Sequence, residues 1–310
     1  MTQVEDDSRA MRLDRDSFAQ GYFKNAVYRH WDPYEIEGLA GDKERFLDEE
    51  PSKAEFEEFR TAVSRFGAGE EAVTEDLMPL ALVLEDINDQ MFISSQIYEE
   101  AKHTQFFDRY WREVIDPVAE ELGYEKTNPT AQRYFNDHYV ALFDKTEAAM
   151  ERLLTEDTPE NRARAYCHYH LTVESVLAQT GYYGFTSAFS PGGSDEVAKR
   201  EWPDMDGIVN GITKIRSDEG RHVGFGMHKV RTLVQSGEVD EAVVQETLQD
   251  LMPHVAGTVG DFGDAINPAP LVGYARDKLT RRLDIITDAD AEVPPVDDLV
   301  DLGDDTVAAD

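Results

Sequence analysis

The sequence has a single cysteine and no long apolar run. Cys167 has no second cysteine to pair with, so a disulfide within the chain is excluded. A membrane-spanning helix needs roughly 18 or more consecutive apolar residues, and the sequence contains no such stretch. The first residues, MTQVEDDSRAMRLDRD, lack the apolar core of a secretory signal. We therefore expect a soluble, cytoplasmic protein without an integral membrane segment.

Basic residues are also scarce. The 310 residues include 64 aspartates and glutamates but only 30 lysines and arginines, which gives a formal net charge of −34. This charge disfavours nucleic acid and anionic lipid surfaces as partners, because both repel an acidic protein. The acids are spread along the chain, as is typical of a halophilic surface in a salt-rich cytoplasm. An acidic docking surface is the alternative.

Strand-like alternation is absent, and the hydrophobic spacing predicts an all-α protein. Helices are expected over 52–85, 87–111, 129–154, 158–189, 204–235, 239–263 and 270–287. The two ends carry many charges and few large apolar residues, so we do not expect them to pack into a core. We divide the chain into a loose N-terminal segment (1–16), one helical domain (17–287) and an acidic, disordered tail (288–310).

The long helix expected in the C-terminal half places two polar side chains on its apolar face. Ile208, Ile212 and Ile215 follow one another at helical spacing. The next residues on this face are Glu219 and His222. Burying an unpaired charge is costly, so this carboxylate and imidazole require a partner in the core.

Three other helices repeat the arrangement. Glu100 and His103 are three residues apart on an apolar face, so both point the same way. Glu70 and Glu174 each stand alone among apolar residues at helical spacing. Chain turns lie about midway between Glu70 and Glu100 and between Glu174 and Glu219, which brings each pair of carboxylates to one height. The Glu-x-x-His spacing is a weak signal alone, and the four faces together carry the prediction.

Two divalent cations can neutralise four carboxylates and two imidazoles that converge in an apolar bundle. One Glu from each of two helices and Glu-x-x-His from each of two others is the pattern of ferritin-like di-iron and di-manganese proteins. Oxygen-rich ligands with one imidazole per metal suit iron or manganese. We predict a ferritin-like helical bundle with a dinuclear site in its four-helix core and additional flanking helices. Four separate glutamates on misassigned faces are the alternative.

Four motifs resemble the ribonucleotide reductase small-subunit superfamily, and within it the ligand-binding oxidase branch. They are GEEAVTEDL (69–77), EEAKHTQ (99–105), TGYY (180–183) and DEGRH (218–222). The resemblance runs from about Phe18 to Arg282. It implies an oxidoreductase with a mixed manganese–iron centre, di-iron being possible, that activates dioxygen for C–H oxidation. It also implies a long-chain fatty acid, or a similar apolar carboxylate, bound at the metals.

The resemblance assigns the ligands as well. The manganese side of the family falls on Glu70, Glu100 and His103, and the iron side on Glu174, Glu219 and His222. An ether cross-link between a tyrosine and a valine falls on Tyr169 and Val73.

Helical spacing alone does not decide which residues form the cross-link. Val73 lies one turn after Glu70 on the same face, as a core valine also would. Tyr169 lies five residues before Glu174, about 140° around an ideal helix. Either the helix distorts locally or Tyr169 reaches in from the side, and Tyr166 competes on spacing alone.

Further polar residues are expected around the ligands. Imidazole ligands usually donate their second N–H to a carboxylate. In the family pattern Asp218 pairs with His103, and Trp31 completes that chain. A solvated Asp218 and a Trp31 that anchors the N-terminal segment are the alternatives. Tyr182 is a candidate to hydrogen-bond near the bound ligand, or else a core aromatic residue, and His170 is not expected to be a ligand.

Two other functions stay open. In a reductase small subunit the usual radical tyrosine would stand where this chain has Phe107, although some such subunits keep phenylalanine there. The tail DLGDDTVAAD lacks the tyrosine and apolar end that dock such subunits, and Glu70 stands where reductases often have aspartate. Iron storage would require a shell-forming oligomer, for which the chain is long. We expect a homodimer.

Overall fold

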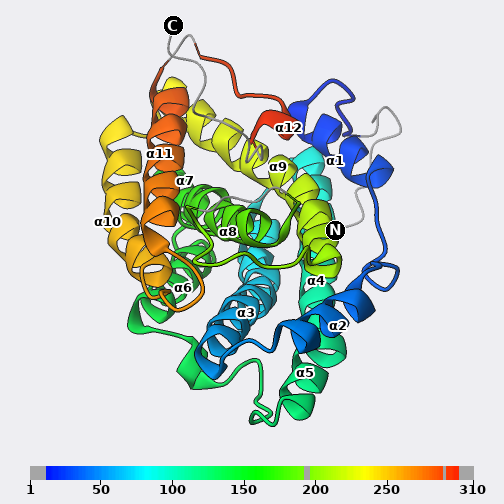
Figure 1. Ribbon diagram of the computed structural model, residues 1–310. Helices are drawn as coiled ribbons and strands as arrows, with labels where there is room; N and C mark the ends of the chain where they lie inside the picture. The colour runs from blue at the N-terminus through cyan, green and yellow to red at the C-terminus, as the bar shows by residue number, and fades with distance from the viewer. Residues whose placement is uncertain (1–11, 192–195, 289–290, 300–310) are drawn as a thin grey trace, which may run out of the picture.

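The computed structural model describes residues 12–191, 196–288 and 291–299, and these form a bundle of helices (Figure 1). Within these ranges the only β-type pairing is an isolated antiparallel bridge between Ala198 and Ile266. The prediction of an all-α protein is confirmed. None of the described helices has both the length and the apolar character needed to cross a membrane.

The helices are listed here in chain order. The first half contains α1 (Phe18–Tyr28), α2 (Leu39–Glu49), α3 (Lys53–Val83), α4 (Ile87–Tyr110), the π-helix η1 (Trp111–Ile115), α5 (Asp116–Glu121), the 3₁₀ turn η2 (Gln132–Tyr134) and α6 (Asp137–Arg152). The second half contains α7 (Pro159–Tyr166), the π-helix η3 (Cys167–Ala178), α8 (Gln179–Phe189), α9 (Asp206–Gln235), α10 (Glu241–Val259), α11 (Pro268–Thr287) and α12 (Val296–Leu299).

Four helical segments surround the centre of the molecule: α3, α4, η3 with its flanking helices, and α9. Ser52 caps α3 with a capping box formed with Glu55, and Asp86 caps α4 directly after the tight connection between them. This short connection makes α3 and α4 antiparallel neighbours, as Figure 1 shows. Helices α10 and α11 pack on η3, whereas α1 packs on α4 and α2 packs on α9.

Apolar residues enclose the centre from both ends. Along α9, Ile212 and Ile215 of one core cluster precede Glu219, and Val223 of the other cluster follows it. Along α3, Val63 and Val73 belong to these same two clusters. The polar side chains between the clusters are therefore shut off from solvent.

The segment from Pro159 to Phe189 is continuous, but its middle is a π-helix. A π-helix closes hydrogen bonds from i to i+5, so residues five apart lie nearly above one another. Thr172 Oγ1 donates to Cys167 O at 2.8 Å across this wider turn. Tyr169 and Glu174, five residues apart within η3, are brought to the same side by this local distortion.

Some boundaries differ from those expected. The helix predicted from Pro129 begins at Asp137, because Asn136 caps it and η2 occupies the residues before it. Helices α1 and α2 were not assigned from the sequence. Within the expected tail, α12 packs on α9 and Leu299 is buried. The expectations for residues 1–11 and 300–310 lie outside the described residues.

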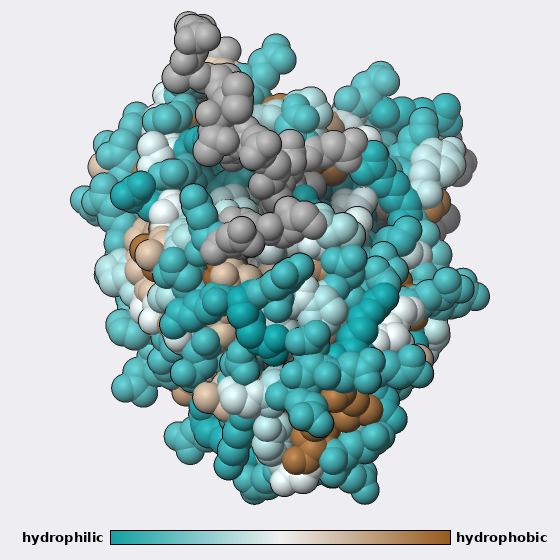
Figure 2. Space-filling model, in the orientation of Figure 1, coloured by the Kyte–Doolittle hydropathy of each residue, from teal (hydrophilic) through white to brown (hydrophobic). Residues whose placement is uncertain are grey.

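The surface reflects the acidic composition. The face in Figure 2 is mostly hydrophilic, with apolar residues confined to small areas. The described charges form several exposed ion pairs, such as Arg152 with Glu156. Such exposed pairs contribute little stability each, so the bundle depends on its two apolar clusters.

Candidate metal centre

Six buried side chains meet in the centre of the bundle. One ligand atom from each of four residues lies within 4.8 Å of the others, in two overlapping groups. The groups are Glu70, Glu100, His103 and Glu219, and Glu100, Glu174, Glu219 and His222. The structure thus brings together all six side chains that were predicted to bind two metals. Two of the carboxylates, on α4 and α9, belong to both groups.

Each imidazole turns its Nδ1 atom toward the carboxylates. His103 Nδ1 lies 3.0 Å from Glu100 Oε2 and 3.4 Å from Glu70 Oε2. His222 Nδ1 lies 3.1 Å from Glu100 Oε1 and 3.3 Å from Glu174 Oε1. Both Nε2 atoms therefore point away from the cluster.

Bound cations would satisfy the polar atoms of the cluster better than hydrogen bonds among these side chains do. Glu174 Oε2, Glu219 Oε2 and His222 Nδ1 are buried, and none of them forms a well-directed hydrogen bond within the described residues, although His222 Nδ1 lies near three carboxylates. Leaving buried polar atoms unpaired is costly. A divalent cation held by the second group would bind all three atoms. Carboxylate oxygens with one imidazole per ion are a donor set that suits manganese or iron.

The pKa values of the carboxylates also indicate that the cluster is suited to bind cations. Burial raises the pKa of Glu70 to about 8. Burial and a neighbouring carboxylate hold the pKa of Glu174 well above its usual value. Burial acts in this direction on Glu100 too, but the imidazoles of His222 and His103 outweigh it and hold the pKa of Glu100 well below its usual value. Without cations, the protein can therefore ionise only part of the cluster.

Each histidine also contacts a carboxylate on the helix of the other histidine. His103 Nε2 lies 3.2 Å from Asp218 Oδ2, and His222 Nε2 lies 2.8 Å from Glu99 Oε2. Arg221 Nη2 donates to both of these outer carboxylates at 2.5 Å. Each of the helices α4 and α9 thus supplies a carboxylate to the histidine of the other helix, and these contacts orient both imidazoles.

Asp218 accepts further hydrogen bonds. Trp31 Nε1 donates to Asp218 Oδ2 at 2.7 Å, and Lys102 Nζ donates to the same oxygen at 3.0 Å. Although burial opposes ionisation, the hydrogen bond to His103 and the charge of Lys102 hold the pKa of Asp218 well below its usual value. The structure therefore places Trp31, Asp218 and His103 in one hydrogen-bonded chain.

Sequence reasoning missed Glu99. It is 2% exposed and is the counterpart of Asp218, contacting His222 and Arg221. A signal was present, because EEAKH (99–103) and DEGRH (218–222) share one pattern of acid, Glu, any residue, base and His. The repeat predicts that each acid before the Glu has the same role.

Two buried tyrosines contact the cluster. Tyr169 Oη donates to Glu100 Oε1 at 2.9 Å, and Tyr182 Oη donates to Glu219 Oε1 at 3.2 Å. Tyr166 packs instead against aromatic rings, including that of Phe225 at 6.1 Å between centroids. Of the two tyrosines that competed on spacing, Tyr169 is the one that hydrogen-bonds the cluster within the described residues.

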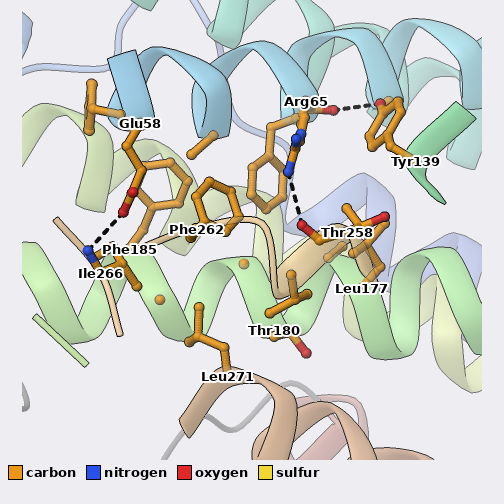
Figure 3. A pocket seen from close by; sticks show the side chains of 18 of the residues that line it. Glu58, Arg65, Tyr139, Leu177, Thr180, Phe185, Thr258, Phe262, Ile266 and Leu271 are labelled. Atoms are coloured by element: carbon orange, nitrogen blue, oxygen red, sulfur yellow. Dashed lines mark hydrogen bonds between the residues drawn. The ribbon is translucent and has the colours of Figure 1, made fainter. Parts of the chain in front are cut away.

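An apolar pocket opens beside the cluster (Figure 3). Its lining includes Glu70, Glu174 and Val73 at the cluster, and it follows α3 back to Glu55. The 18 residue steps from Glu55 to Val73 span about 27 Å of helix. The opposite wall is formed by η3 and α8, with α11 contributing Leu271. The pocket is therefore long, apolar and joined to the carboxylates.

Two polar residues of α3 hold the α10–α11 connection over this pocket. Glu58 accepts hydrogen bonds from the backbone N–H groups of residues 263–266. Arg65 Nη1 donates to Thr258 O at 2.9 Å, and its guanidinium lies 5.2 Å from the ring centre of Phe262. Figure 3 shows Glu58 and Arg65 reaching from α3 toward this connection. Phe262, Ala265 and Ile266 of the connection line the pocket.

The fold and the buried cluster define a ferritin-like bundle of the dinuclear-metal type. No protein-family model matches the chain. Solved structures of R2-like ligand-binding oxidases do match. A variant with an aerobically reconstituted Mn/Fe cofactor has a TM-score of 0.74 and 26% identity, covering 88% of this chain and 94% of that chain. A variant with an Fe/Fe cofactor has a TM-score of 0.75 and 26% identity, with the same coverages.

These matches confirm the resemblance to the ligand-binding oxidase branch and the ferritin-like fold predicted from the sequence. A further Mn/Fe variant has a TM-score of 0.75 and 26% identity, covering 88% of this chain and 98% of that chain. The chain thus spans nearly the whole length of the oxidases it resembles. The likeness supports the prediction of an oxidoreductase.

Proposed function

We propose that this protein is a manganese–iron oxidase that activates dioxygen, binds a long-chain fatty acid beside the metals and joins Tyr169 to Val73 by an ether. The observation that carries the proposal is the 2.9 Å hydrogen bond from Tyr169 Oη to Glu100, beside the pocket that Val73 lines. The similar oxidases with Mn/Fe cofactors support the choice of metals.

The six side chains of the cluster would hold the metals. Glu100 and Glu219 belong to both groups, so each would help to hold both ions. The outer carboxylates Glu99 and Asp218 keep each imidazole in place. When bound, the ions supply the redox chemistry that reduces dioxygen.

The protein supplies the geometry of the cross-link. Forming the ether breaks the O–H bond of Tyr169 and the tertiary C–H bond of Val73 and makes one C–O bond. Two protons and two electrons leave. Dioxygen is the oxidant and is reduced to two waters, for which the reduced ions would supply the other two electrons and solvent the other two protons. The phenol proton has an acceptor already in place, because Tyr169 Oη donates to Glu100 Oε1.

The pocket supports the proposed fatty acid. Its lining is mostly apolar along α3, η3 and α8, and the lining residues of α3 extend over about 27 Å of helix, which suits a long alkyl chain. The carboxylates of the cluster line one end of it, where the head group would bind beside the metals that these carboxylates would hold. An apolar occupant also excludes water from the site of oxidation.

Peptide mass mapping tests the proposal. Protein loaded with manganese(II) and iron(II) without oxygen should show separate Tyr169 and Val73 peptides, and after exposure to air one joined peptide lighter by two hydrogens. Val73→Ala and Tyr169→Phe should each abolish the joined peptide while metal content is kept. Tyr166→Phe is the matched control and should still form it. A joined peptide in Tyr169→Phe, or none in loaded wild type, contradicts the proposal.

One observation favours a second function, a ribonucleotide reductase small subunit. The Trp31–Asp218–His103 chain is the type of route by which such subunits pass electrons. Phe107 packs on Phe66 at 5.3 Å, so a radical tyrosine is absent from that position. A loaded protein that never forms the joined peptide would favour this function.

A further inference from the structure

A polar pair lies in the core beside the six proposed ligands. Gln96 is on α4, one turn before Glu100, and His170 follows Tyr169 on η3. Both side chains are fully buried at 0% exposure. Buried polar side chains cost stability unless they are hydrogen-bonded, so the contacts of this pair indicate its role.

Gln96 contacts two residues of η3 at once. Its Nε2 donates to Glu174 Oε1 at 2.8 Å and lies 3.4 Å from Tyr169 Oη. Tyr169 Oη in turn donates to Glu100 Oε1. The amide therefore spans the gap between α4 and η3 at the point where the phenol oxygen meets the cluster.

His170 fixes which way this amide faces. Gln96 Oε1 lies 3.3 Å from His170 Nε2. An amide has a donor end and an acceptor end, so an N–H from His170 to Oε1 directs the NH₂ group to Glu174 and Tyr169. Burial holds the pKa of His170 well below its usual value, so the ring is neutral and carries one N–H. His170 Nδ1 has no partner among the described residues, which places that N–H on Nε2.

Tight packing holds His170 in this place. The His170 and Tyr169 rings meet edge to face at 4.7 Å between centroids. A Cβ at Gly226 of α9 would lie 2.2 Å from His170 Cβ, so α9 can approach η3 this closely only with glycine there. The imidazole is therefore wedged between α9 and the tyrosine.

We propose that Gln96 and His170 are positioning residues for the cross-link: His170 orients the Gln96 amide, which holds Tyr169 Oη against Glu100. Neither residue touches the reacting carbon. The proposal rests on the proposed function, because the ether is the reaction that the phenol oxygen must be positioned for. It explains why a histidine that is not a proposed ligand lies next to Tyr169.

The test compares four variants in the metal-loaded protein. Gln96→Leu removes the amide, and His170→Phe keeps a ring but removes its N–H. His170→Gln restores a donor, and His168→Phe is a matched control two residues away on η3. Metals per chain and the rate at which the joined peptide appears after exposure to air are measured together.

Gln96→Leu and His170→Phe are expected to keep two metals per chain and to slow the joined peptide by about tenfold or more. His170→Gln should recover most of the rate, and His168→Phe should match wild type. A purely structural role would lower metal content and melting temperature in parallel with the rate. A wild-type rate in Gln96→Leu would overturn the proposal.

A crystal structure of Gln96→Leu, metal-loaded and kept without oxygen, gives a readout that needs no ether. Tyr169 Oη is expected to leave hydrogen-bond distance of Glu100. An unmoved hydroxyl overturns the positioning role. A wild-type protein that forms no ether overturns the proposed function instead, so the two failures are distinguishable.

Discussion

Replacing Glu58 by glutamine is expected to loosen the connection between α10 and α11 that lines the apolar pocket. Glu58 is 9% exposed. Its Oε2 accepts from Gly263 N at 2.7 Å and Asp264 N at 2.5 Å, and its Oε1 accepts from Ala265 N at 3.1 Å and Ile266 N at 2.8 Å. A glutamine amide has one oxygen, so two of the four N–H groups would face an NH₂ group that cannot accept.

The size of the effect follows from these four bonds. A buried donor that loses its acceptor costs about 1–3 kcal/mol, so the two N–H groups together set a range of about 2–6 kcal/mol. The two remaining bonds also weaken, because their acceptor is no longer charged. The connection is at the surface of the bundle and can relax toward water. We therefore expect the free energy of unfolding to fall by about 2–3 kcal/mol.

Urea unfolding and hydrogen exchange measure this. The amides of residues 263–266 should exchange faster in Glu58→Gln, while those in the middle of α9 should not. Glu71→Gln is the matched control, because Glu71 is exposed on the same helix. Unchanged exchange at residues 263–266, with a stability loss below about 0.5 kcal/mol, would refute the view that the carboxylate holds this connection.

Three further outcomes are expected. Burial and then Glu147 raise the pKa of Asp76 to about 7, so wild type loses stability as pH rises from the ordinary aspartate pKa of about 4 up to about 7, above which the loss is complete. Asp76→Asn should therefore have a higher free energy of unfolding than wild type, and the difference should be larger at pH 8 than at pH 5. At pH 8 we expect about 1–2 kcal/mol after solvent screening, measured by urea unfolding. Because the net charge is −34, the melting temperature should rise with potassium chloride, and a flat profile would contradict a halophilic surface. Glu99→Gln should weaken metal binding about tenfold by removing the charge beside His222, and full retention after dialysis against a chelator would contradict this.

Helical spacing was enough to predict the cluster, because each proposed ligand lies on the buried face of its own helix. Glu100 and His103 could be predicted from the 3.6-residue period of the helix and from the cost of burying a charge alone. Glu99 was missed because it lies about 100° around the helix from Glu100, off the face that the periodicity follows. Tyr169 was placed by resemblance, and the π-helix explains why ideal α geometry could not place it.

Glu58 and Arg65, the two residues of α3 that hold the α10–α11 connection, carry no comparable signal in the sequence. Glu58 binds backbone N–H groups more than 200 residues away, and any residue type except proline offers such a group. Arg65 likewise donates to the carbonyl of Thr258. A single sequence therefore gives no pattern for such contacts, and only the folded arrangement of α3 against the α10–α11 connection reveals them.

The paired carboxylate–histidine contacts between α4 and α9 determine when, during folding, the chain can hold metal. Glu99 and His222 are 123 residues apart, and His103 and Asp218 are 115 residues apart. A growing chain that has made only α3 and α4 offers Glu70 and one Glu-x-x-His pair, with an imidazole that lacks its outer partner. An ion captured then would be held by an incomplete set of ligands and would exchange freely. If the proposed ligands hold the metals, firm retention of metal would therefore be a late event that marks a chain folded as far as α9.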